Sequence, residues 1–220
     1  FRKIYGVLGN PIGHSLSPVM HNAAFEAAGV NALYVAFESS DLKGSISGMR
    51  ALGIRGMSVT IPFKTAVIPY LDELDELAEK IGAVNTLVNR DGRLKGYNTD
   101  GLGAMKALQV KIDLSGKRCV LVGAGGAARG IGFMARECGM ELVVVNRSIG
   151  RGRALADLLK CPFIPLERIQ EIRGDVMIQT TPVGMFPHED DSPVPDNVFR
   201  KEMVVMDAIY NPLETRFLKT

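Results

Sequence analysis

Several polar side chains in the first half of the chain have the right types to bind a small polar molecule and to transfer a proton. A lysine ammonium can stabilise an oxygen on which negative charge develops, and it can donate a proton to that oxygen. Carboxylate, amide and hydroxyl groups can hold neighbouring polar groups by hydrogen bonds. The residues concerned are Ser15, Ser17, Thr60, Lys64, Asn85 and Asp100.

Four of these residues also have an ordinary structural explanation. Ser17 can cap a helix, and Asp100 can cap the next one. Asn85 can be a turn residue, and Lys64 can be a solvated charge. Their joint occurrence at predicted strand ends favours a binding site.

A glycine-rich segment in the second half has the pattern of a dinucleotide-binding turn. It fits G-x-G-x-x-A, directly after an apolar strand and at the opening of a helix. Glycines let the backbone approach a pyrophosphate, whose charge is met by amide groups at the helix N-terminus. Such a turn alone is weak evidence, but the strand, turn, helix and strand around it favour dinucleotide binding. The predicted cofactor-binding residues are Gly123, Ala124, Gly125, Gly126 and Ala127.

The end of the next predicted strand indicates which dinucleotide binds. Enzymes that use NAD tend to place Asp or Glu about 20 residues past the glycines, where it accepts hydrogen bonds from the ribose. This sequence has Asn146, Arg147 and Ser148 instead, with Arg151 close behind. Two guanidinium groups and a hydroxyl suit a dianionic 2′-phosphate. The predicted cofactor is therefore NADP. The alternative is that the arginines are only solvated charges at the start of a helix, which is a better explanation for Arg151 than for Arg147.

The elements that position these residues alternate between strand and helix, which predicts an α/β fold with largely parallel sheets. In the first half, strands are predicted over residues 4–8, 34–37, 54–61, 84–89 and 94–98, with a hairpin turn at Asp91-Gly92. Helices are predicted to begin at Ser17, as the cap before Pro18, and near Asp41. An acidic helix is predicted over residues 72–80.

The second half has the texture of a nucleotide-binding βαβ series. Apolar stretches predict strands buried on both faces over residues 119–122, 142–145, 175–179 and 203–207. A helix is predicted over 127–137. The domain change is expected near Asp100 to Leu102, with a helix over 102–108 carrying the chain across. The predicted domains are therefore residues 1–101 and residues 102–220.

Composition favours a small-molecule partner. The chain has 220 residues, of which 46% are hydrophobic, and 26 basic residues stand against 24 acidic ones. Because no basic run stands out, nucleic acid and anionic membranes are not expected as partners. Three widely spaced cysteines indicate neither a metal site nor a secreted disulfide scaffold, and the residues given predict neither a transmembrane stretch nor a signal peptide. We expect a cytoplasmic protein without a metal, as a monomer or a homodimer.

Seven ordered motifs are spread over essentially the whole chain. They are G-N-P-I-G-H-S-L-S-P-V-M-H-N, S-V-T-I-P-F-K, G-A-V-N-T, G-Y-N-T-D-G, G-A-G-G-A-A-R, N-R-S and D-A-I-Y-N-P. In these motifs and their order, the chain resembles the shikimate dehydrogenase family. The resemblance implies an N-terminal α/β substrate-binding domain and a C-terminal Rossmann-type NADP-binding domain, with a cleft between them.

The resemblance also implies roles for individual residues. Lys64 and Asp100 match the family's catalytic pair. Ala208 falls where the family places an apolar residue against the nicotinamide. The residues that match substrate contacts are Ser15, Ser17, Thr60, Lys64, Asn85, Asp100 and Tyr210. The residues that match NADP contacts are Gly123 to Ala127 and Asn146 to Arg151.

The implied activity is the reversible NADPH-dependent reduction of 3-dehydroshikimate to shikimate, in the pathway to chorismate and the aromatic amino acids. A quinate or dual quinate/shikimate dehydrogenase is the alternative. Arg147 and Arg151 argue against those quinate enzymes that prefer NAD. A catalytically inactive metabolite sensor is a distant alternative, because a sensor needs no proton donor such as Lys64. A folate-linked dehydrogenase explains the glycine turn but not the serine pair.

The sequence departs from the family pattern in two places. The family commonly has Asn where this chain has Ser58, and a shorter side chain there bears on substrate preference. The family continues beyond Thr220 through a glycine-rich loop with a glutamine substrate ligand and a final helix. We expect this return segment to be absent from the present sequence.

Overall fold

The chain folds into two compact units. A computed structural model describes residues 1–13 and 15–220. The first unit comprises Phe1–Thr99 and the second Asp100–Thr220. Both units are built from alternating strands and helices, which confirms the predicted α/β class.

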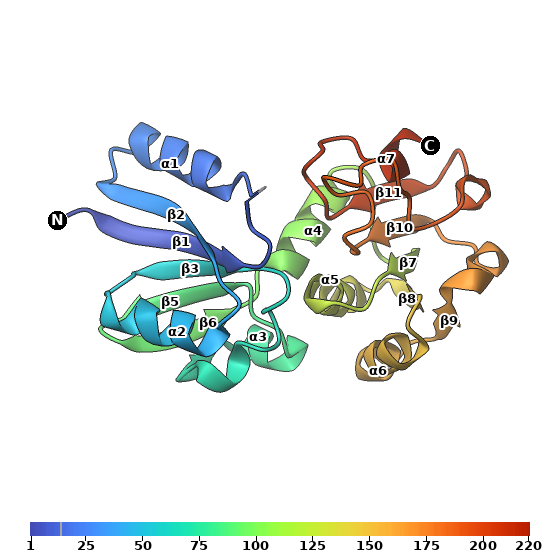
Figure 1. The fold of residues 1–220 in the computed structure, drawn as a ribbon. Helices are drawn as coiled ribbons and strands as arrows, with labels where there is room; N and C mark the ends of the chain where they lie inside the picture. The colour runs from blue at the N-terminus through green and yellow to red at the C-terminus, as the bar shows by residue number, and fades with distance from the viewer. Residues whose placement is uncertain (14) are drawn as a thin grey trace. The chain divides into compact units, whose positions relative to one another are not determined.

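The first unit is a six-stranded mixed sheet with helices on its faces (Figure 1). The strand order is β2-β1-β3-β5-β6-β4; β1, β2 and β3 are parallel, β5 is antiparallel to both its neighbours, and β4 is parallel to β6. The elements are β1 (Lys3–Gly9), α1 (Ser17–Ala27), β2 (Ala32–Glu38), α2 (Leu42–Ala51), β3 (Gly56–Val59), a 3-10 turn (Ile68–Tyr70), β4 (Glu73–Leu74), α3 (Glu76–Ile81), β5 (Thr86–Arg90) and β6 (Arg93–Tyr97).

Alternation along these strands divides the core of the first unit between the two faces of the sheet. On one face, Phe25 of α1 packs against Tyr5, Val7 and Tyr34. On the other face, α2 and α3 cover the larger cluster; its fully buried members include Leu8, Met49, Ala78, Leu87 and Leu94. The burial of large apolar side chains on this second face is the main source of stability for the unit.

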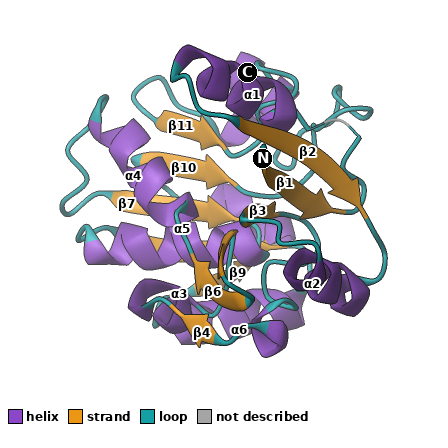
Figure 2. Cartoon of the chain, turned by 90° about the vertical axis from the view of Figure 1, so that its left-hand side faces the viewer, coloured by secondary structure: helices purple, strands orange, loops and turns teal. Residues whose placement is uncertain are grey.

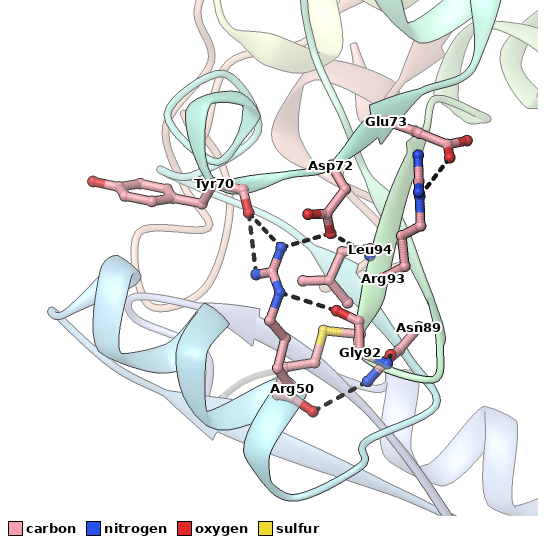
Figure 3. A network of polar contacts seen from close by, with 9 residues as sticks. Arg50, Tyr70, Asp72, Glu73, Asn89, Gly92, Arg93 and Leu94 are labelled. Carbon is pink, nitrogen blue, oxygen red and sulfur yellow. Dashed lines mark hydrogen bonds and ion pairs between the residues drawn. The ribbon is translucent and has the colours of Figure 1, made fainter.

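Arg50, near the end of α2, ties together the edge of the sheet where β6 begins (Figure 3). Its guanidinium donates to the carbonyl oxygens of Tyr70 and Gly92 and to Asp72 Oδ2, the last at 2.7 Å. The same Asp72 oxygen accepts from the backbone N–H of Leu94 at 2.7 Å. This hydrogen bond and the neighbouring Arg50 hold the pKa of Asp72 below its usual range, although partial burial opposes the shift.

The second unit is a five-stranded, fully parallel sheet of order β11-β10-β7-β8-β9. Figure 2 shows β11, β10 and β7 side by side with their arrows in the same direction. The elements are α4 (Asp100–Gln109), β7 (Arg118–Val122), α5 (Gly126–Glu137), β8 (Glu141–Asn146), α6 (Ile149–Leu159), β9 (Phe163–Pro165), a 3-10 turn (Leu166–Glu171), β10 (Val176–Gln179), a second 3-10 turn (Asp196–Val198), β11 (Val204–Asp207) and α7 (Arg216–Lys219).

The connections of this sheet are those of a doubly wound Rossmann-type fold. The chain leaves β7, builds β8 and β9 on one side, and then returns to build β10 and β11 on the other. Strands β7 and β10 are almost wholly buried, as expected for parallel strands covered on both faces. The close packing of α4 against α5 requires glycine at position 101, since a Cβ there would lie 2.1 Å from the carbonyl oxygen of Gly130 in α5.

Three local predictions were wrong. The N-cap of α1 is Leu16 rather than Ser17, and within the described residues Ser17 N–H instead donates to Ser15 Oγ at 3.3 Å. The acidic helix begins at Glu76 rather than at residue 72, because Glu73–Leu74 pairs with β6 as strand β4. The first sheet is mixed rather than largely parallel, since β5 runs against both its neighbours.

Among residues 1–13 and 15–220, no helix is long and apolar enough to cross a membrane. In the same part of the chain, no group of three or more His, Cys, Asp or Glu side chains is arranged to hold a metal ion.

Candidate active site

One edge of the first sheet collects most of the predicted substrate residues. Strands β1, β3 and β6 end at this edge, and antiparallel β5 begins there. The loops that leave β1, β3 and β6 and the turn that enters β5 therefore emerge together. These segments carry Ser15 and Ser17, Thr60 and Lys64, Thr99 and Asp100, and Asn85, respectively.

The serine loop after β1 is fixed by a carboxylate at the end of β2. The backbone N–H of Ile12 donates to Glu38 Oε2 at 2.9 Å, and the Ile12 side chain is buried. Ser15 N–H then donates to the Ile12 carbonyl oxygen at 2.9 Å. Ser15, just before α1, and Ser17, its first residue, are both half-buried.

The turn after β3 places Lys64 beside the strand that follows it. Phe63 is buried in the core and anchors the turn. The carbonyl oxygen of Lys64 accepts from the backbone N–H of Val84 at 2.7 Å, one residue before Asn85. At the other end of the turn, Thr60 N–H donates to the carbonyl oxygen of Leu8 at 2.9 Å. Lys64 is half-buried, as a group that must meet a ligand requires.

Asn85 fixes the segment that leads to Asp100. Its amide nitrogen donates to Thr99 Oγ1 at 2.9 Å, and its amide oxygen accepts from Thr99 N–H at 3.1 Å. Asn98 is buried and donates to the carbonyl oxygen of Ala83 at 3.0 Å. The position of Asp100, the next residue and the first of α4, thus depends on these amide contacts.

Ser58, the residue that departs from the family pattern, has a defined partner inside the first unit. The hydroxyl of Tyr34 donates to Ser58 Oγ at 2.7 Å across the intervening strand β1. The Tyr34 ring is buried and stacks on His21, with 4.3 Å between the ring centroids. The shorter serine side chain is accommodated by a tyrosine from β2.

In the second unit, the point where the strand order reverses lies between β7 and β10. In doubly wound sheets, ligands bind outside the carboxyl ends of the strands at this point. Gly123 follows β7 with a positive φ of 119°. A Cβ on Gly123 would lie 2.3 Å from Thr180 Oγ1, after β10, so the close approach of these two loops requires glycine.

The N-terminus of α5 provides a place for a pyrophosphate. Gly125 is its N-cap, and within the described residues a Cβ added there meets no atom within 4 Å. The helix N–H groups that lack intrahelical partners therefore face an open approach. Gly123 and Ala124 lie in the turn before this N-cap, and Gly126 and Ala127 are the first two residues of α5.

Arginines follow β8 at the start of α6. Arg147 and Arg151 are exposed, and the Asn146 side chain donates to the carbonyl oxygen of Ser148 at 2.9 Å, which shapes the turn. Two cations at a helix N-terminus oppose the helix dipole. A bound 2′-phosphate would offset this unfavourable arrangement, so the residues present fit NADP.

The remaining predicted residues follow β11. Ala208 and Tyr210 are placed after the strand end, and Ala208 N–H donates to the carbonyl oxygen of Gln179 at 2.9 Å. The predicted residues therefore form one set at the binding edge of the first sheet and another at the carboxyl edge of the second. Glu38 and Thr99, which hold these segments in place, were not predicted as site residues; their polar side chains at strand ends are the signal that could have indicated them.

The second unit is doubly wound and fits NADP, and the same chain carries a sheet edge with a lysine and several hydroxyl groups. Together these features define an NADP-dependent oxidoreductase. Comparisons with known proteins narrow this class. Residues 7–87 match the family model described as the shikimate dehydrogenase substrate binding domain. The chain is 48% identical to shikimate dehydrogenase (NADP(+)) of Bacillus cereus strain B4264, over 99% of this chain and 82% of that protein. This chain belongs to the shikimate dehydrogenase family, as predicted.

Solved structures agree with this family. A crystal structure of a shikimate dehydrogenase in complex with NADP+ has a TM-score of 0.92 and 43% identity, covering 99% of this chain and 80% of that one. The Thermus thermophilus enzyme, in complex with NADP(H) and shikimate, has a TM-score of 0.89 and 38% identity, covering 99% of this chain and 82% of that one.

Proposed function

We propose that this chain catalyses the reversible NADPH-dependent reduction of 3-dehydroshikimate to shikimate. The observation that carries the proposal is the edge of the first sheet, where four separate segments present a lysine, an amide and several hydroxyl groups. These groups suit a molecule with one carboxylate and several ring hydroxyls. Relatives named for the same reaction, with 44% to 48% identity, support it.

Lys64 acts on the reacting oxygen. When bound, NADPH supplies the hydride for the ketone carbon. As that carbon is reduced, its oxygen gains negative charge, which the Lys64 ammonium stabilises before it donates a proton. In the reverse direction, Lys64 accepts the proton of the substrate hydroxyl. Asp100 accepts a hydrogen bond from a ring hydroxyl and so fixes the orientation of the substrate.

The remaining contacts divide between the two ends of the substrate. Ser15 and Ser17 donate hydroxyl hydrogen bonds to the carboxylate, and Tyr210 adds a further contact. Thr60 and Asn85 bind ring hydroxyls. Because Asn85 is also bonded to Thr99, one amide links substrate binding to the segment that carries Asp100.

The two parts of the chain take different tasks in this proposal. Residues 1–101 form the substrate-binding catalytic domain, and residues 102–220 form the NADP-binding domain. In the latter, the turn from Gly123 to Ala127 binds the pyrophosphate. Asn146, Arg147, Ser148 and Arg151 bind the 2′-phosphate side, and Ala208 lies against the nicotinamide. A cytoplasmic location and a monomeric or homodimeric state stay predictions from the sequence.

The test is a set of four reactions followed by absorbance of the reduced nicotinamide, with shikimate or quinate and with NADP+ or NAD+. We expect turnover largely confined to shikimate with NADP+. Efficient turnover of quinate would instead assign dual specificity and direct attention to Ser58 and its partner Tyr34. Binding of shikimate without turnover would refute the proposal and support a sensor.

A further inference from the structure

The loop that follows β11 carries two proposed functional residues, and a part-buried hydrogen bond between Asp207 and Thr215 closes its base. Asp207, the last residue of β11, accepts at Oδ2 from Thr215 Oγ1 at 2.6 Å. Its other oxygen, Oδ1, accepts from the backbone N–H of Ile209 at 2.9 Å. Between the two bridged residues lie Ala208 and Tyr210. A single carboxylate thus bonds both ends of the segment.

The side chain of Thr215 makes this bridge instead of capping helix α7. It occupies the N-cap position of α7, where a threonine oxygen usually accepts from the helix N–H groups. Within the described residues it makes no such capping bond, and its hydroxyl donates to Asp207 instead. Thr215 has no exposed surface, and its neighbour Phe217 is buried against Phe199. The far end of the loop is therefore fixed to the core.

The environment of Asp207 makes the bridge strong. Burial raises the pKa of Asp207, while the hydrogen bonds from Thr215 and Ile209 oppose that shift. Hydrogen bonds to a charged, partly buried group are stronger than those between neutral groups. Within the loop, Phe186 N–H donates to the carbonyl oxygen of Asn211 at 3.3 Å, and Tyr210 is exposed.

We infer that Asp207 and Thr215 are positioning residues for the reaction, which hold the 208–214 loop so that Tyr210 and Ala208 are presented in one conformation. Neither residue touches substrate or cofactor in the proposed site; both act through the loop. This inference rests on the proposed function of Tyr210 and Ala208, but the bridge itself can be tested without any ligand.

The experiment compares Thr215→Val, which keeps the shape and removes the hydroxyl, with Thr215→Ser, which keeps the hydroxyl. Amide hydrogen exchange of residues 208–214 should rise about tenfold in Thr215→Val and return to the wild-type rate in Thr215→Ser. With shikimate and NADP+, Thr215→Val should raise KM for shikimate roughly tenfold with kcat changed less than about threefold, because the loop binds ground state and transition state alike. Thr215→Ser should restore KM.

Two further variants separate the bridge from the docking of α7 and from a folding defect. Asp196→Asn weakens the exposed 2.6 Å ion pair between Asp196, in the second 3-10 turn, and Arg216 of α7, and should leave KM unchanged. Asp207→Asn removes the charge but keeps an acceptor, and should give a smaller rise in KM than Thr215→Val. This variant decides the matter if Thr215→Val does not fold.

Unchanged loop exchange in Thr215→Val, an equal KM effect in Asp196→Asn, or a faster-exchanging loop with an unchanged KM would each overturn the inference. Wild-type protein without shikimate turnover would overturn the proposed function instead, and the exchange rates would still decide whether the bridge holds the loop.

Discussion

Gly123 and Gly125 stand two residues apart in the same turn, yet the structure predicts opposite consequences for replacing each with alanine. At Gly123, φ is 119° and the new Cβ meets Thr180 Oγ1 at 2.3 Å. Backbone strain of this kind costs about 1 to 3 kcal/mol, which lowers the melting temperature of a chain this size by roughly 2 to 12 °C. Gly123→Ala should therefore destabilise the protein even without cofactor.

At Gly125, φ is −90° and, among the described residues, nothing lies within 4 Å of the added Cβ. Gly125→Ala should therefore keep the melting temperature of the free protein. The open space is where we place the pyrophosphate, and a methyl group that crowds a filled site costs about 1 to 3 kcal/mol. The dissociation constant for NADP+ should then rise roughly 5- to 150-fold.

Thermal unfolding followed by circular dichroism, with and without NADP+, measures the first effect, and calorimetric titration with NADP+ measures the second. The two variants control for each other because they make the same chemical change in the same turn. Wild-type affinity for NADP+ in Gly125→Ala would refute the placement of the pyrophosphate. An unchanged melting temperature in Gly123→Ala would refute the argument from strain.

Three more predictions follow from the same structure. Replacing Arg147 and Arg151 together with alanine should raise KM for NADP+ by about 10- to 100-fold and leave KM for NAD+ nearly unchanged, since charge-assisted bonds to the 2′-phosphate are lost. Steady-state kinetics with both cofactors measures this, and an equal rise in KM for NADP+ and NAD+ would contradict it. Lys64→Ala should lower kcat by roughly 10² to 10⁴-fold with little change in shikimate affinity, and equal loss of binding would exclude the acid-base role. Because the pKa of Asp72 is lowered in the folded state, its contribution to the free energy of unfolding is fully present above the unfolded pKa of about 4. That contribution is lost as the pH falls through the lower folded pKa. Asp72→Asn, which weakens the contacts to Leu94 and Arg50, should thus lower the free energy of unfolding by about 1 kcal/mol at pH 7, discounted for the partly exposed side chain, and by progressively less in acid. A loss of unfolding free energy that stays constant across pH in urea unfolding would contradict this prediction.

Much of the second unit could be predicted from the sequence because its signals are local. Continuous apolar stretches end at glycine or polar residues, and the predicted strands over 119–122 and 142–145 match β7 and β8 to within one residue at each end. Predicting the first unit was less successful: strand β4 lies within a stretch whose acidic residues predicted a helix. Its pairing with β6, more than 20 residues later, decided its structure.

The sequence by itself determined the chemical types at the site, the glycine turn, the basic strand end and the family. Local patterns carry these features because each depends on residues a few positions apart. Only the tertiary structure decided that β5 runs antiparallel to β3, which brings Asn85 to the edge where β1, β3 and β6 end. The same holds for the bonds of Tyr34 with Ser58 and of Asp207 with Thr215. Such contacts join residues on different elements, so they exist only after the strands have paired and the helices have packed.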